Sequence, residues 1–138
     1  MRLTFATVVL AVVACGTSST VQPRLQPRLE QAFTLGLDQT AEFPDLHLSI
    51  TFRSVPSDSR CPRTVQCVWE GNAEVRLEVA VRDQVRWVVL NTALEPREAV
   101  VGSQRLLLRA VSPEPPLRPE HYLALSSFNR SESSRPAC

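Results

Sequence analysis

Apolar residues fall at every second position over much of the chain beyond residue 31, which is the period of half-buried β-strands. In residues 46–53 and 75–81, Leu, Ile, Val or Phe alternates with mostly polar side chains. A third alternating run, 85–89, follows the second across Arg82 and Asp83. The last two runs therefore predict a β-hairpin.

Shorter alternating runs predict further strands at 33–37, 106–110 and 122–124, and the stretch 94–101 is either a loop or a short edge strand. The prolines beyond residue 31 are expected between strands, where a missing N–H does not interrupt a ladder. No stretch has a convincing helical period. The pattern predicts one all-β domain over residues 31–129, an antiparallel sandwich or barrel of about 6–8 strands. A polar tail, 130–138, is expected to be mobile.

The first 14 residues differ from the rest, because one charge, Arg2, precedes an apolar run that stops at Cys15. The run is too short for a spanning helix, which needs about 20 apolar residues, and is typical of a secretion signal. The residues Val12-Val13-Ala14-Cys15 resemble the bacterial lipobox. The resemblance implies that Cys15 carries lipid and anchors the mature protein to a membrane. With Gly16 next, it implies the outer membrane where the cell has two.

Residues 15–30 have no apolar period and contain a short duplication, Gln22-Pro23-Arg24-Leu25 followed by Gln26-Pro27-Arg28-Leu29. Proline favours extended backbone, so this segment is expected to be a tether that spaces the domain from the lipid. Disorder without a spacing role is the alternative. Removing residues 1–14 takes away one of 15 basic residues and leaves 14 against 14 acidic ones. A neutral mature chain predicts no nucleic-acid partner.

The most distinctive pattern is Asp-Ser-Arg-Cys-Pro from Asp58, four spacer residues, then Cys67, one residue, Trp69, one residue and Gly71. It resembles a family of small exported bacterial proteins, many of them lipoproteins of unassigned function. The resemblance extends over about residues 33–128 and implies a similar β-rich layout. It implies no particular chemistry.

In an exported chain Cys61 and Cys67 are expected to oxidise to a structural disulfide. Closing so short a loop is worth about 2–2.5 kcal/mol in the chain-entropy model. Zinc binding is the alternative, but the five-residue spacing is wider than usual ligand spacings, and His47 and His121 lie elsewhere. Neither a metal nor a cofactor is predicted.

The rest of the motif predicts a structural or binding loop. Trp69 is expected to pack over the disulfide or the core, with an exposed indole in a ligand cleft as the alternative. Gly71, with Asn72, is expected to form a turn or bulge at positive φ. Arg60 is expected to clamp the carboxylate of Asp58 or to cap loop carbonyls.

No pattern assembles a catalytic site, since neither a nucleophile elbow nor a phosphate-binding loop is visible. The favoured hypothesis is a non-enzymatic envelope module that binds an envelope protein, a polymer or a small ligand. The alternatives are a secreted inhibitor of a hydrolase and an enzyme whose site is assembled from scattered residues. Cys138 is left over and is either free, paired within the chain or paired with a second copy.

Overall fold

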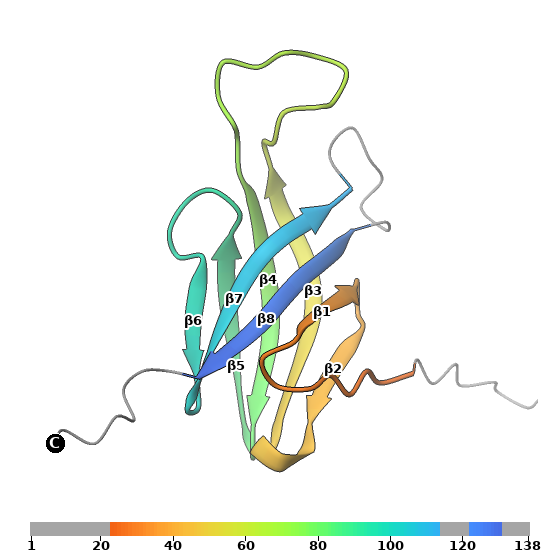
Figure 1. Cartoon of the computed structure of the whole chain (residues 1–138), viewed down its shortest axis with the longest axis vertical. Coiled ribbons are helices and arrows are strands. Elements are labelled where there is room, and N and C mark those ends of the chain that lie inside the picture. Colours follow the sequence, from red (N-terminus) through yellow and green to blue (C-terminus); the bar gives the residue numbers. More distant parts are fainter. Residues whose placement is uncertain (1–22, 114–121, 131–138) are drawn as a thin grey trace, which may run out of the picture.

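Two four-stranded antiparallel sheets stack face to face in the computed structural model, which describes residues 23–113 and 122–130 (Figure 1). The predicted signal segment, Cys15, His121 and Cys138 lie outside the described residues. The first sheet, sheet I, has the order β2-β3-β4-β5, and sheet II has the order β1-β8-β7-β6. The all-β sandwich predicted from the alternating pattern is confirmed.

The strands of sheet I are β2 (Thr40–Phe43), β3 (Leu48–Asp58), β4 (Ala73–Val81) and β5 (Gln84–Asn91). The strands of sheet II are β1 (Ala32–Gly36), β8 (Leu123–Arg130), β7 (Gln104–Ser112) and β6 (Glu98–Val101). A 3-10 turn, η1 (Pro44–Leu46), joins β2 to β3. The predicted hairpin is β4–β5, with Val81 opposite Gln84.

The core lies between the sheets and consists of the alternate residues that face inward from both. Phe43 of sheet I meets Phe128 of sheet II edge-on, with ring centroids 4.7 Å apart, and Phe33 lies 5.5 Å from Phe43. Other fully buried side chains are Leu35, Ile50, Phe52, Val75, Leu77, Val79, Leu90, Leu106 and Leu108. Burial of this apolar surface is the main stabilising contribution to the fold.

Several boundaries differ from those that alternation predicts. Leu46 lies in η1, and His47 follows it at φ 48°, so the strand begins at Leu48 and His47 is not an outward strand residue. Pro56 was expected between strands but lies within β3, in a stretch where the β3–β4 register shifts between Ser54 and Ser57. An irregular ladder tolerates proline because the N–H is not needed there.

Two more differences concern short segments. Residues 94–101 divide into a loop and the four-residue edge strand β6, so both alternatives are partly right. The ordered chain begins before residue 31, since Leu25 forms a parallel bridge with Ala41 of β2. Its N–H donates to Thr40 O at 2.9 Å, and its carbonyl accepts from Glu42 N at 2.7 Å. Within the described residues, no helix is long and apolar enough to cross a membrane.

Candidate functional site

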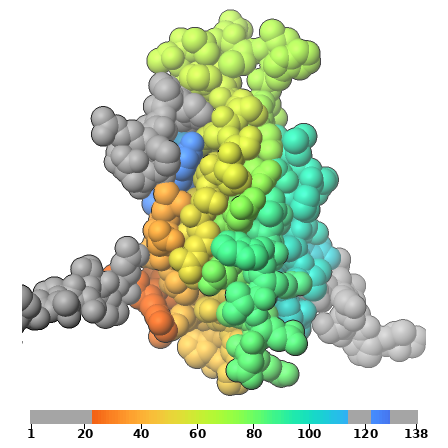
Figure 2. Space-filling model, turned by 180° about the vertical axis from the view of Figure 1, so that it is seen from behind, coloured from red at the N-terminus to blue at the C-terminus, as the bar shows by residue number. Residues whose placement is uncertain are grey.

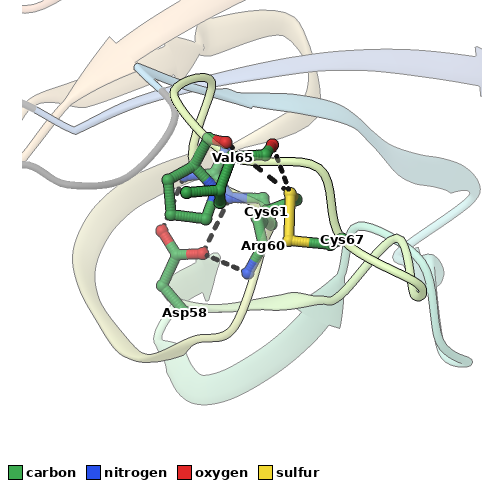
Figure 3. The surroundings of a disulfide bond; sticks show 6 residues. Asp58, Arg60, Cys61, Val65 and Cys67 are labelled. Atoms are coloured by element: carbon green, nitrogen blue, oxygen red, sulfur yellow. Dashed lines mark hydrogen bonds and ion pairs between the residues drawn. A yellow bond between two sulfur atoms is a disulfide. The ribbon is translucent and has the colours of Figure 1, made fainter.

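The segment 59–72 joins β3 to β4 and projects beyond the end of the sandwich (Figures 1 and 2). Cys61 and Cys67 are joined by a disulfide with Cα atoms 5.8 Å apart, which confirms the predicted pairing (Figure 3). Within the ring, Val65 N donates to Pro62 O at 3.2 Å and closes a turn. We call residues 59–72 the disulfide loop.

We call the two ends of the disulfide loop, residues 59–60 and 71–72, its stem. An ion pair holds the first of these ends. Arg60 donates from Nε to Asp58 Oδ1 at 2.8 Å and from Nη2 to Asp58 Oδ2 at 2.6 Å. The two side chains are only 11% and 8% exposed. Tyr122, just before β8, donates its hydroxyl to Asp58 Oδ2 at 2.9 Å. Bidentate pairing of this kind fixes orientation as well as charge.

Burial of Asp58 opposes ionisation, but hydrogen bonds from the side chain and backbone of Arg60 and from Tyr122 outweigh it. The pKa of Asp58 is therefore lower than its usual value. The pKa of Tyr122 is raised, first by burial and then by its bond to the Asp58 carboxylate. Asp58 is thus the charged acceptor and Tyr122 the neutral donor at neutral pH.

The same arginine also links the two sheets. Its guanidinium donates to the carbonyl oxygens of Val111, in β7, and Pro113, which follows β7, the second at 2.9 Å. Arg60 therefore pairs with Asp58, as predicted (Figure 3), and also caps two backbone carbonyls, one in β7 and one directly after it. The disulfide loop begins at a point that is fastened to sheet II as well as to sheet I.

The other side of the stem depends on Gly71 and Asn72. Gly71 has φ +73°, as predicted, and a Cβ there would lie 2.0 Å from Ser59 O. Asn72 exchanges hydrogen bonds with Ser59, and its Nδ2 donates to Asn91 Oδ1 at 2.8 Å. Its Oδ1 accepts the N–H of Ala93 at 3.0 Å in the β5–β6 loop. Only glycine fits the close approach at residue 71.

The prediction that Trp69 packs over the disulfide or the core is wrong. Its side chain is 81% exposed, and neighbouring Val68 is 88% exposed. The period-two argument does not apply, because residues 59–72 contain no strand. Of the alternative, an exposed indole in a ligand cleft, the structure shows the exposure.

Trp69 borders an open hollow of about 560 Å³ between the disulfide loop and the ends of β5 and β7. Thr92 and Arg97 line the hollow opposite the loop, and Arg60, Cys61 and Cys67 contribute to its wall. The volume falls in the range of ligand sites, which is roughly 300–1,000 Å³. Glu70 and Arg109 also line the hollow, so side chains of both charges stand beside the apolar indole.

Sequence reasoning missed Arg97 at the hollow, the bond of Tyr122 to Asp58 and the bond of Asn72 to Asn91, because these groups are brought together by the fold and are distant in the chain. An asparagine directly after Gly71 was the one local signal, and it predicted the turn alone. Among the described residues, no group of three or more His, Cys, Asp or Glu side chains is placed to hold a metal ion. The chain matches no family model, no curated protein and no solved structure in the comparisons made with each.

Proposed function

We propose that this protein is an exported lipoprotein of the bacterial cell envelope, anchored through Cys15, whose β-sandwich is a non-enzymatic binding module. The disulfide loop is its recognition element, and the partner is an envelope protein or polymer. The observation that carries this proposal is the exposure of Trp69 on a loop whose stem is held by buried bonds.

An exposed tryptophan in solution costs free energy that contact with a partner recovers, and tryptophan is enriched among the residues that dominate binding energy. Here the loop is already closed by the disulfide and fastened by Arg60 and Asn72. Little conformational entropy remains to be lost when a partner binds, so the contact retains more of its gross binding energy.

The position of the disulfide loop also supports the proposal. The first described residues lie beside β2, and the bridge from Leu25 to Ala41 places them opposite Ile50 of β3. From Ile50 to Asp58 the strand climbs about 26 Å, at roughly 3.3 Å per residue. The described chain therefore enters the sandwich near the start of β3, whereas the disulfide loop projects from the end of that strand (Figure 1).

The turn in the disulfide ring bears on the hydrolase-inhibitor alternative. A segment recognised by strand addition is extended. Residues 62–65 instead form a turn closed by the bond from Val65 N to Pro62 O. The turn favours recognition through the exposed side chains that follow Cys67.

Anchoring is tested by Cys15→Ser in the full chain, with membranes separated by ultracentrifugation. We expect the wild type in the membrane fraction and the variant in the soluble fraction, because the lipid contributes about 0.8 kcal/mol per buried methylene. A variant that still sediments with membranes would exclude the lipid anchor.

Recognition is tested by affinity capture from detergent-solubilised envelopes of the source cell, with Trp69→Ala compared with Trp87→Ala. Both indoles are exposed, at 81% and 58%, so the second variant is a matched control for the loss of an indole. We expect partners retained by the wild type and by Trp87→Ala to be lost from Trp69→Ala. Equal retention by all three proteins would refute the role of the loop.

A further inference from the structure

Strand β5 lies at the free edge of sheet I and differs from the other three edge strands. It is eight residues long, whereas β1, β2 and β6 have five, four and four. The edge of β2 is covered by the chain around Leu25, which bonds to Thr40 and Glu42. The β4–β5 register is continuous from Glu74 to Val81, and β5 contains no proline. Bulges and prolines are usual devices that protect an edge from pairing.

The hydrogen bonds at the end of β5 show which backbone groups face outward. Thr92 N donates to Ala73 O, across the end of β4, and Asn91 N donates away from β4, to Pro96 O. Direction alternates along an antiparallel strand, so the even-numbered residues 84–90 bond to β4. The N–H and carbonyl groups of Val85, Trp87 and Val89 consequently face the open edge. No hydrogen bond within the described chain satisfies them.

The same three residues form an apolar column on the outer face of sheet I. Val85, Trp87 and Val89 are 63%, 58% and 36% exposed. Their neighbours across the ladder are Ala80, Glu78 and Arg76 of β4. The same strand therefore has backbone groups that point to the free edge of the sheet and apolar side chains on its outer face. A second strand that adds to a sheet edge uses both kinds of contact.

We propose that β5 is a self-association edge, to which a second copy of this chain adds its own β5 in antiparallel orientation about a two-fold axis at Trp87. This axis places Trp87 opposite Trp87 of the second copy, and Val85 opposite Val89 of the second copy. These are the residues whose backbone groups face outward, so each opposed pair exchanges both hydrogen bonds. The apolar columns become continuous, and a two-fold interface requires such self-complementarity.

Charge does not oppose this pairing. The axis sets Arg86 opposite Val88 of the second copy and Asp83 opposite Asn91 of the second copy, so no like charges meet. A charged residue on an edge strand, such as Arg86 on β5, can prevent a second strand from pairing. The guanidinium of Arg86, however, donates to the carbonyl oxygen of Val100 in β6 and is held within its own domain.

Pairing of single strands buries less than the roughly 1,200–2,000 Å² of a standard interface. We therefore expect association that is weak in dilute solution and stronger where copies are confined together. Confinement on a membrane rests on the proposed lipid anchor, whereas the pairing itself does not.

Thiol crosslinking of the full chain in intact expressing cells tests the register, in a Cys138→Ser background that removes a competing thiol. Trp87→Cys should give a species of twice the chain mass, because opposed residues have Cα atoms about 5.5 Å apart. Val85→Cys alone should not, because the two copies of residue 85 lie about 13 Å apart, four residues along the strand. Val85→Cys and Val89→Cys co-expressed should crosslink to each other.

The mixed pair retains Trp87 and so serves if Trp87→Cys fails to fold. Adding Trp87→Lys to the mixed pair should reduce its crosslinking several-fold, and Trp69→Lys should leave it unchanged. The latter result separates self-association from recognition by the disulfide loop. The proposal is overturned if Trp87→Cys and the mixed pair crosslink no more than Val85→Cys alone. A crosslinked species of any other mass would show that a different protein pairs with β5, and it would also overturn the proposal.

Discussion

Asp58→Asn is expected to destabilise the fold by about 3 kcal/mol at neutral pH. The substitution keeps the shape of the side chain but removes the charge that compensates the guanidinium of Arg60, which is 11% exposed. Removing one member of a buried ion pair costs roughly 3–5 kcal/mol. We expect the lower end of this energy range, because the side-chain oxygen of asparagine still accepts one hydrogen bond. For a domain of this size, the melting temperature should fall by more than about ten degrees.

The pH dependence follows from the lowered pKa of Asp58. A carboxylate whose pKa is depressed by folding contributes stability that is present above its unfolded pKa, about 3.9. That contribution is lost as the pH falls through the lower pKa of the folded state. The difference between wild type and Asp58→Asn should therefore be constant from about pH 7 to about pH 5 and should shrink below about pH 3.9.

Urea unfolding of the full chain with its disulfide intact, followed by circular dichroism across this pH range, measures both effects. Glu78→Gln is the matched control, because it breaks the exposed pair with Arg53, in which the side chains are 29% and 38% exposed. Exposed pairs contribute less than about 1 kcal/mol. The reasoning fails if Asp58→Asn costs no more than the control, or if its cost is unchanged at about pH 2.

Two further variants test the stem and the ring of the disulfide loop. Gly71→Ala should destabilise by well over the 1–2 kcal/mol of a left-handed conformation, because its Cβ would lie 2.0 Å from Ser59 O. Gly102→Ala is the control, because Gly102 is also at positive φ but a Cβ there would meet no neighbouring group within 4 Å, so only the backbone strain should reduce its stability. Equal losses of unfolding free energy for the two variants in urea would contradict the argument. Replacing Cys61 and Cys67 together by serine should cost about 2–2.5 kcal/mol in the same assay, and an unchanged midpoint would show that the stem alone holds the loop.

The strands that could be predicted are those long enough to show a period. Strands β3, β4 and β5 have eight or more residues, and their alternating apolar residues predicted them. Alternate burial is regular in β4, whereas in β5 the alternating residues Val85, Trp87 and Val89 lie on the exposed face. Strand β2 has four residues and only two buried positions, which is too few to distinguish a strand from a loop. The pairing of strands across the two sheets has no local signal at all.

The candidate site was predicted in part for the same reason. The roles of Gly71 and Arg60 toward their neighbours depend on residues nearby in sequence. The bonds from Arg60 to Val111 and from Tyr122 to Asp58 span 51 and 64 residues, and only the fold brings those groups together. Trp69 was misjudged because tryptophan is buried on average, whereas both tryptophans of this chain are exposed.

The parallel bridge between Leu25 and β2 has a mechanical consequence. A pull on the N-terminal segment is borne first by the two backbone bonds of Leu25 and by the ion pair of Arg24 with Glu42. If these give way, the load passes along the chain to β1 and its ladder with β8. The fastening of Asp58 and Arg60 lies at the far end of β3, outside this path of force. The bonds of Leu25 and Arg24 to β2 can therefore break under tension while the disulfide loop keeps its shape.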